Sequence, residues 1–188
     1  MITEKDTIKC ESIFNDERTH RYLWKRVWDK DKPIISVIML NPSQSDNIIT
    51  DTTTGLVVNN VGCLNGGEYG GVEILNLYSK LTPKLRFSEP DDELNCEEND
   101  SYILQSVKTS SKVVLAWGKA ANTNARIEER AIQVLNLIKD YKDKLYVLSD
   151  GERKFLHPLT PVLRSGNNWV LEKFTDNIQP KTETNVPV

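Results

Sequence analysis

Residues 34–51, IISVIMLNPSQSDNIITD, form the stretch on which the fold of this chain depends. The run IISVIML is apolar apart from one serine, and its length and β-branched content predict a strand buried on both faces, as in a parallel sheet. Pro42 lacks an N–H group and disfavours helical geometry at Asn41, so the strand must end there. Open α/β sheets bind ligands at the carboxyl ends of such strands. The first candidates for chemistry are therefore Asn41, Ser43, Asp46 and Asp51, and the alternative for this stretch is a strand followed by an ordinary turn.

Length and composition indicate one soluble globular domain. The chain has 188 residues, of which 38% are hydrophobic, which is enough to bury a core. We expect one domain over residues 1–174 and a disordered tail over residues 175–188. No apolar run is long enough to span a membrane, and the N-terminus lacks a secretory pattern, so we expect a cytoplasmic protein. The three cysteines, Cys10, Cys63 and Cys96, are far apart, which argues against a disulfide framework and against a metal site.

Net charge does not indicate a nucleic-acid partner, but its distribution is uneven. The formal net charge is −3. Residues 88–100 hold seven carboxylates and no Lys or Arg, so the rest of the chain is basic overall. A basic body with one acidic segment is compatible with phosphate contacts elsewhere on the surface.

The remaining sequence alternates predicted strands with predicted helices. Aromatic residues at positions 22, 24 and 28 predict a strand, and the charged turn at residues 29–33 predicts that this strand forms an antiparallel hairpin with residues 34–40. No GxGxxG or P-loop motif is present. The pattern predicts a three-layer αβα sandwich with a central, mostly parallel four-stranded sheet plus the N-terminal antiparallel hairpin. The further predicted elements are helices at 54–64, 92–110 and 119–139, strands at 72–78, 113–117 and 145–148, and a closing segment at 169–174.

Four segments that end or follow predicted strands carry polar residues or glycine: MLNPS, EILNLYSKLT, VVLAWGKAA and LHPLTPVLR. Alone, an Asn at a strand end is usually a turn former, and a His before Pro is usually a structural loop residue. In this order, across about residues 34–164, the segments resemble the motifs of the uracil-DNA glycosylase superfamily. The RY…W hairpin with NPS, LN, AWG and HPL also resembles a bacterial subfamily catalogued as a domain of unknown function.

The resemblance implies a uracil-DNA glycosylase-like fold and an enzyme that flips a base out of DNA before hydrolysing its N-glycosidic bond. Asn41 would orient the attacking water. Asn76 would pair its donor and acceptor with uracil O4 and N3–H, a pattern that cytosine reverses. His157 would donate to base O2 as negative charge develops there. Asp51, or Asp46, could act as the base, although capping of the loop is the alternative for both.

The resemblance also implies which residues contact the substrate. DNA, single- or double-stranded, is the expected partner of a monomer that needs no metal or cofactor. The apolar residues of the histidine loop would wedge into the gap left by the flipped base. The base would lie against Leu40, Pro42 and Val58; the wedge would be Leu159, Val162 or Leu163; and the phosphate contacts would be Ser43, Lys119 and Arg164.

Three positions depart from the superfamily pattern. Met39 stands in place of a glycine, Asn41 in place of the carboxylate of the most active branch, and Ser43 in place of a tyrosine that excludes a 5-methyl group. No aromatic residue matches the one that stacks on the base, although Tyr69 or Trp117 could supply it. Two alternatives therefore stay open: a DNA-binding protein on the same fold that does not cleave, and a hydrolase of free nucleosides or nucleotide derivatives.

Overall fold

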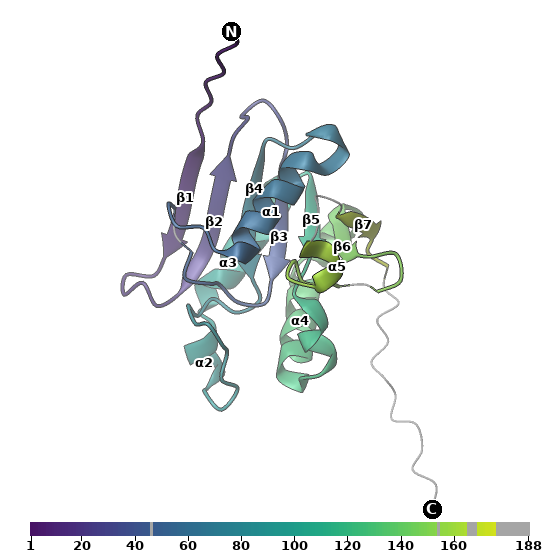
Figure 1. Cartoon of the computed structure of the whole chain (residues 1–188). Helices are drawn as coiled ribbons and strands as arrows, with labels where there is room; N and C mark the ends of the chain where they lie inside the picture. The colour runs from purple at the N-terminus through teal and green to yellow at the C-terminus, as the bar shows by residue number, and fades with distance from the viewer. Residues whose placement is uncertain (46, 154, 165–168, 176–188) are drawn as a thin grey trace, which may run out of the picture.

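The fold is built on one mixed β-sheet (Figure 1), and the computed structural model of the chain describes residues 1–45, 47–153, 155–164 and 169–175. Within these residues the sheet has seven strands in the order β1-β2-β4-β3-β5-β6-β7. The pairs β4/β3, β3/β5 and β5/β6 are parallel, whereas β1/β2, β2/β4 and β6/β7 are antiparallel. The strands are β1 (Lys9–Phe14), β2 (Arg21–Val27), β3 (Ile34–Met39), β4 (Gly71–Asn76), β5 (Lys112–Leu115), β6 (Leu145–Ser149) and β7 (Val170–Lys173).

The predicted parallel four-stranded sheet is present as the centre of a wider sheet. The predicted pairing of the N-terminal hairpin is wrong, because β2 pairs with β1 and β4 and does not pair with β3. β4 lies between β2 and β3, and Glu73 on β4 forms an ion pair of 2.7 Å with Lys25 on β2. Alternating aromatic residues identify a strand, but they do not specify which strand lies beside it.

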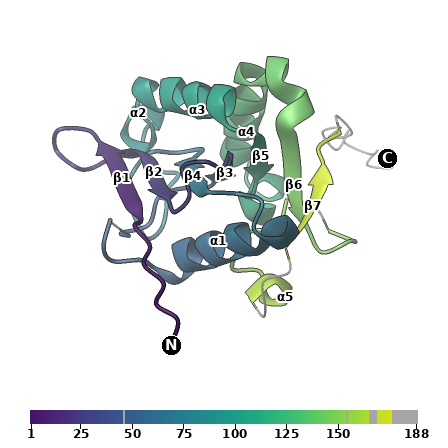
Figure 2. The ribbon, with the colours of Figure 1, turned by 90° about the horizontal axis from the view of Figure 1, so that it is seen from above.

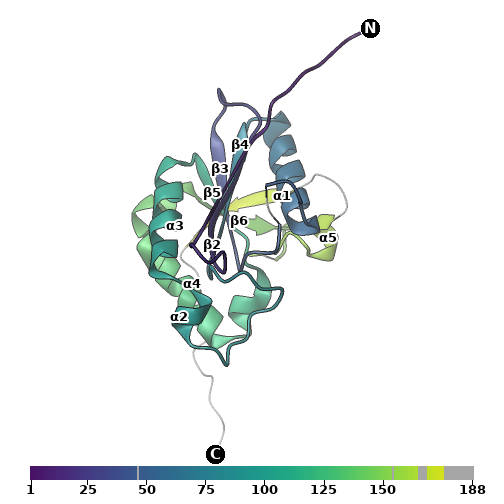
Figure 3. The same ribbon diagram turned by 90° about the vertical axis from the view of Figure 1, so that its left-hand side faces the viewer.

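Helices cover both faces of the sheet (Figures 2 and 3). α1 and α5 lie on one face, and α3 and α4 lie on the other (Figure 3). In the described part of the chain, no helix has both the length and the apolar character needed to cross a membrane. The α-helices are α1 (Thr52–Cys63), α2 (Asp91–Leu94), α3 (Glu97–Thr109), α4 (Ala125–Leu137) and α5 (Pro161–Arg164), and the 3₁₀ helices are η1 (Leu64–Gly66), η2 (Gly118–Asn122) and η3 (Lys139–Lys144).

Two predicted helices are shorter than expected. The segment 92–110 is divided into α2 and α3, because Asn95 and Cys96 adopt extended backbone geometry. The segment 119–139 begins its α-helix only at Ala125, where the Asn124 side chain accepts from the backbone N–H groups of Arg126 and Ile127. Side-chain capping of this kind fixes where a helix starts.

Alternate residues of the strands enter two separate apolar clusters, because successive side chains of a strand point to opposite faces. Ile38 and Leu75 pack with the residues of α3 and α4, whereas Met39 and Ile74 pack with those of α1 and α5. Asn76 is two residues beyond Ile74, so its side chain lies on the α1 side of the sheet.

The chain changes the direction of its connections at the carboxyl ends of β3 and β5. These two strands are neighbours, yet β3 leads into α1 on one face and β5 leads toward α4 on the other. The connecting loops therefore separate at this point, and ligands of open α/β sheets bind in the opening. Apart from residue 175, the predicted tail over residues 175–188 lies outside the described residues, and the single domain over residues 1–174 stays a prediction.

Candidate functional site

Asn41, which follows β3, connects the loops at the ends of two neighbouring strands. Its Nδ2 donates to the carbonyl oxygen of Thr82 at 2.7 Å and to that of Pro42 at 3.3 Å. Thr82 belongs to the segment after β4. No described residue donates to Asn41 Oδ1. Because Nδ2 is anchored, Oδ1 is an acceptor held in one direction, as orienting a water molecule requires.

Asn76, the last residue of β4, is buried and leaves one polar group unpaired. The residue is 1% exposed and lies beside Met39 in the parallel register. Its Nδ2 is buried and has no acceptor among the described residues. Native proteins pair the large majority of buried side-chain donors, and an unpaired one is costly. The unpaired donor therefore indicates a ligand acceptor on the α1 side of the sheet.

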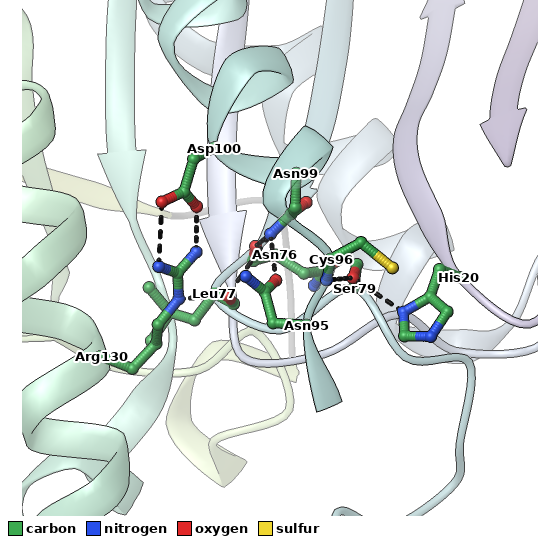
Figure 4. Close-up of polar contacts among 9 residues, drawn as sticks. All are labelled: His20, Asn76, Leu77, Ser79, Asn95, Cys96, Asn99, Asp100 and Arg130. Atoms are coloured by element: carbon green, nitrogen blue, oxygen red, sulfur yellow. Dashed lines mark hydrogen bonds and ion pairs between the residues drawn. The ribbon is translucent and has the colours of Figure 1, made fainter. Parts of the chain in front are cut away.

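The backbone at the end of β4 is held by side chains from two helices (Figure 4). Asn99 of α3 donates through Nδ2 to the Asn76 carbonyl oxygen at 3.0 Å. Arg130 of α4 donates through Nε to the Leu77 carbonyl oxygen at 2.8 Å and forms an ion pair with Asp100. These contacts fix the position from which the Asn76 side chain projects, and such supporting contacts are what a binding site needs to keep its geometry.

His157 lies against the carboxyl end of β5. Gly118, which follows Trp117, has a φ of +81°, and a Cβ added there would be 3.0 Å from His157 Cβ. The Leu159 N–H donates to His157 Nδ1 at 3.1 Å, so the neutral ring carries its proton on Nε2. Burial lowers the pKa of His157 below its usual 6.5, and the charge of Asp51 opposes this shift. At neutral pH the imidazole is therefore an uncharged hydrogen-bond donor.

Asp51 caps α1 with one oxygen and keeps the other one unpaired. Oδ1 accepts from the Thr54 N–H at 2.7 Å. Oδ2 is buried and has no partner among the described residues. The carboxylate acts electrostatically on both His157 and Arg21. The capping role is confirmed, and it leaves one oxygen for chemistry; Asp46, the other candidate base, lies outside the described residues.

Arg21, at the start of β2, is a buried cation that the sequence analysis did not identify as part of a site. It is 2% exposed, and its Nη1 donates to the Ser45 carbonyl oxygen at 2.7 Å and to Ser45 Oγ at 3.1 Å. Its Nε is buried and has no acceptor among the described residues. Burial lowers the pKa of Arg21 to about 10, with Asp51 opposing the shift, so the guanidinium is charged at neutral pH. An Arg that opens a strand looks like an ordinary solvent-exposed charge in sequence, so the pattern carries no signal for this role.

We use the name strand-end site for four residues that lie at the carboxyl edge of the parallel strands: Arg21, Asp51, Asn76 and His157. It offers unpaired donors at Asn76 Nδ2 and Arg21 Nε, an imidazole donor at His157 Nε2, and an unpaired acceptor at Asp51 Oδ2. This set suits a small polar ring that carries carbonyl oxygens. In the ranges that the structure describes, no group of three or more His, Cys, Asp or Glu side chains could hold a metal ion.

The predicted base-contacting residues do not all face this site. Pro42 is buried in the loop after β3, and Val58 of α1 packs against the apolar cluster on the α1 side. The Leu40 side chain packs against the cluster on the α3 and α4 side. Leu40 therefore lies on the opposite side of the sheet from Asn76, and its side chain is not placed to contact a base there.

The predicted DNA-contacting residues differ in how accessible they are. Leu163 is 3% exposed within the apolar cluster on the α1 side, so it cannot be the wedge. Val162 is 47% exposed, and Leu159 is half-buried. Of the predicted phosphate contacts, Lys119 on η2 and Arg164 are exposed, and Ser43 is half-buried. Arg164 Nε donates to the Leu159 carbonyl oxygen. Ser43 Oγ lies 3.0 Å from Ser45 Oγ.

Neither aromatic residue proposed to stack on the base reaches the strand-end site. Tyr69 precedes β4 and lies at the amino ends of the parallel strands, the edge opposite to the site. Trp117 belongs to the cluster on the α3 and α4 side and stacks on Phe155, with ring centroids 5.6 Å apart. Both suggestions are wrong: Tyr69 lies at the other edge of the sheet, and the Trp117 ring points to the other face.

Acidification should destabilise the protein through its two histidines. Burial lowers the pKa of both His20 and His157 from 6.5, so below that value the unfolded chain binds more protons than the folded one. The folded state therefore loses stability as the pH falls from above 6.5 toward the lower pKa values that the two histidines have in the folded protein. The melting temperature should fall between about pH 7.5 and about pH 5.5. Replacing both histidines by Gln should flatten this dependence, and an unchanged dependence in that variant would assign it to carboxylates.

Comparison with known proteins places the chain in a family without a described function. No curated protein and no solved structure matches it. One family model matches residues 21–159, which run from Arg21 at the start of β2 to Leu159 in the histidine loop. The matched range includes all four residues of the strand-end site. The chain belongs to the family described as "Protein of unknown function (DUF1643)".

Proposed function

We propose that the protein is a uracil-DNA glycosylase-type enzyme that flips uracil out of DNA and hydrolyses its N-glycosidic bond. The observation that carries the proposal is the buried, unpaired Nδ2 of Asn76 at the edge where His157 presents Nε2. Uracil offers carbonyl oxygens on both sides of its N3–H, so one molecule can accept from both donors. A base reaches such a buried site only after it leaves the stacked helix.

The chemistry divides into departure of the base and addition of water. When the bond between C1′ and N1 breaks, its electron pair leaves with the base, and His157 donates from Nε2 to the O2 that gains negative charge. Asn41 Oδ1 orients a water molecule, and Asp51 Oδ2 accepts a proton as the water oxygen bonds to C1′. The proton on Asp51 then passes to solvent or to the released base.

The charges beside the site fit these steps. Arg21 is a buried cation that interacts electrostatically with Asp51. The neutral imidazole of His157 donates without presenting a positive charge to the developing sugar cation. The exposed side chains of Lys119, Val162 and Arg164 then remain for contacts with the DNA outside the site.

The test is an alkali-cleavage assay on a labelled single strand that contains one uracil. The wild-type protein should produce alkali-labile sites, and Asn76→Ala should slow their formation about tenfold or more, because a base-pairing donor is lost. Asn59→Ala is the matched control, since Asn59 is an exposed residue of α1, and it should match the wild type. Binding of the strand without any abasic product would replace this proposal with a DNA-binding role.

A further inference from the structure

A surface hollow of about 410 Å³ lies beside the strand-end site. Phe14 at the end of β1 is on its rim, and β1 runs in the same direction as β4 because each pairs antiparallel with β2. The hollow is therefore at the carboxyl edge of the sheet. Ser45 connects the two places, since it lines the hollow and also binds Arg21. The lining residues are Phe14, Arg18, Thr19, Gln44, Ser45, Lys80 and Leu81.

The charges of this hollow suit a polyanion. Its lining contains Arg18 and Lys80 and no carboxylate. Lys80 forms an ion pair of 2.8 Å with Glu89, whereas Arg18 has no ion pair with any described residue. A second cavity, of about 310 Å³ between α2 and α4, has the opposite character. Its lining has more carboxylates than cations: Asp91, Asp92, Glu97, Asp100 and Glu129, against Arg126 and Arg130, which pair with Asp91 and Asp100.

The turn between β1 and β2 presents the Arg18 guanidinium as a flat platform. Arg18 has a φ of +54°, a conformation that costs most non-glycine residues about 1–2 kcal/mol. Asn15 holds the turn, because its Oδ1 accepts from the N–H groups of Thr19 and His20 at 2.9 and 2.8 Å. The guanidinium carbon is 4.1 Å from the centre of the Phe14 ring. One face of the guanidinium is thus supported by an aromatic ring, and Arg18 is otherwise exposed.

We propose that this hollow, which we call the flanking-nucleotide site, binds the nucleotide of single-stranded DNA next to the one that enters the strand-end site. Its base stacks on the Arg18 guanidinium, as bases stack on Arg and aromatic planes in single-strand binding proteins. Its phosphate lies beside Lys80. The volume is within the range of about 300–1,000 Å³ for ligand sites. This inference rests on the proposed function, because it takes the occupant to be the same strand.

The test measures binding of a fluorescein-labelled single strand of about twelve nucleotides by anisotropy over a range of salt concentrations. Arg18→Asn removes the guanidinium but tolerates the left-handed backbone, so the fold is kept. It should weaken binding about tenfold, because the stacking plane is lost, and it should leave the slope of log K against log salt nearly unchanged, because the phosphate contact belongs to Lys80. Arg18→Lys should keep the slope yet bind several-fold more weakly than the wild type, because an ammonium group offers no plane for stacking. Phe14→Leu should also weaken binding several-fold.

The matched control is Arg86→Ala, which removes an exposed arginine outside the hollow and should bind like the wild type. Arg18→Asn and Phe14→Leu variants that bind as tightly as this control would overturn the inference, as would a wild-type protein that does not bind the strand. The glycosylase proposal fails in a different measurement, when bound strand yields no alkali-labile sites. Where cleavage occurs, Arg18→Asn should raise KM and leave kcat within about twofold. The reason is that the stacking contact is equally strong in the enzyme–substrate complex and in the transition state.

Discussion

Asp51→Asn is expected to lower kcat for uracil release about a thousandfold, within the range of about 10²–10⁴ for loss of a catalytic base. The amide can still cap α1, because its Oδ1 accepts from the Thr54 N–H as the carboxylate does. In place of Oδ2 it has an NH2 group, which cannot accept a proton from water. The substitution also removes the negative charge that acts on His157 and Arg21. The variant therefore separates the capping role of Asp51 from its proposed chemical role, and single-turnover kinetics on a uracil-containing strand measure the difference.

Asp51→Ala provides the comparison for stability. It should lose the same activity and, in addition, about 1 kcal/mol of stability through the lost cap. Asp51→Asn should melt closer to the wild-type temperature than Asp51→Ala does. An Asp51→Asn variant with wild-type kcat would show that Asp51 is only a helix cap, and the water would then need another base.

Gly118→Ala is expected to lower kcat about tenfold without any change to a group that contacts the substrate. The added Cβ would meet His157 Cβ at 3.0 Å, in a segment whose φ of +81° already disfavours a side chain. The histidine loop must then move away from the end of β5. The contact requires His157 to shift by a few tenths of an ångström. Because a displacement of about 1 Å in a positioned group can cost about 10²-fold in rate, this smaller shift should cost about tenfold.

Gly151→Ala is a matched control for the backbone strain. Its φ is +93°, and an added Cβ there meets no atom of a described residue within 4 Å. Both variants should lose about 1–2 kcal/mol of stability through the left-handed conformation, but only Gly118→Ala should lose activity. Equal activity in the two variants would show that close packing of Gly118 on His157 does not matter for the chemistry.

The parallel centre of the fold could be predicted from the sequence, because each of its strands is an apolar run closed by turn-forming residues. Ile34–Met39 and Gly71–Asn76 are examples, and both end at residues of special interest. The neighbour of β2 could not be predicted. Its partner β4 lies more than forty residues further along the chain, and Trp24 of β2 pairs with Ile74 of β4. The alternation of side chains carries no information about such distant pairing.

The candidate site was predictable to the extent that strand ends carry polar residues. Asn76 and His157 were singled out this way, and the structure places both at the carboxyl edge. Leu40 and Leu163 were assigned to ligand contacts because they are apolar and near the motifs. Leu40 packs on the opposite face of the sheet, because a shift of one residue turns a strand side chain to the other face. Leu163, in α5, is buried in the cluster on the α1 side. Arg21 was missed because only its burial, which leaves it 2% exposed, distinguishes it from a surface arginine.

The acidic segment that includes α2 makes one flank of the carboxyl edge of the sheet negatively charged and leaves the other flank positively charged. Arg126 of α4 holds this segment in place by donating to the Phe87 and Glu89 carbonyl oxygens and pairing with Asp91. Carboxylates thus outnumber arginines in the cavity on the α3 and α4 side, while Arg18 and Arg21 lie toward the α1 side. The nucleic acid strand proposed above would be repelled on the first flank and attracted on the second. This asymmetry selects one orientation of approach, and raising the salt concentration should weaken that selection.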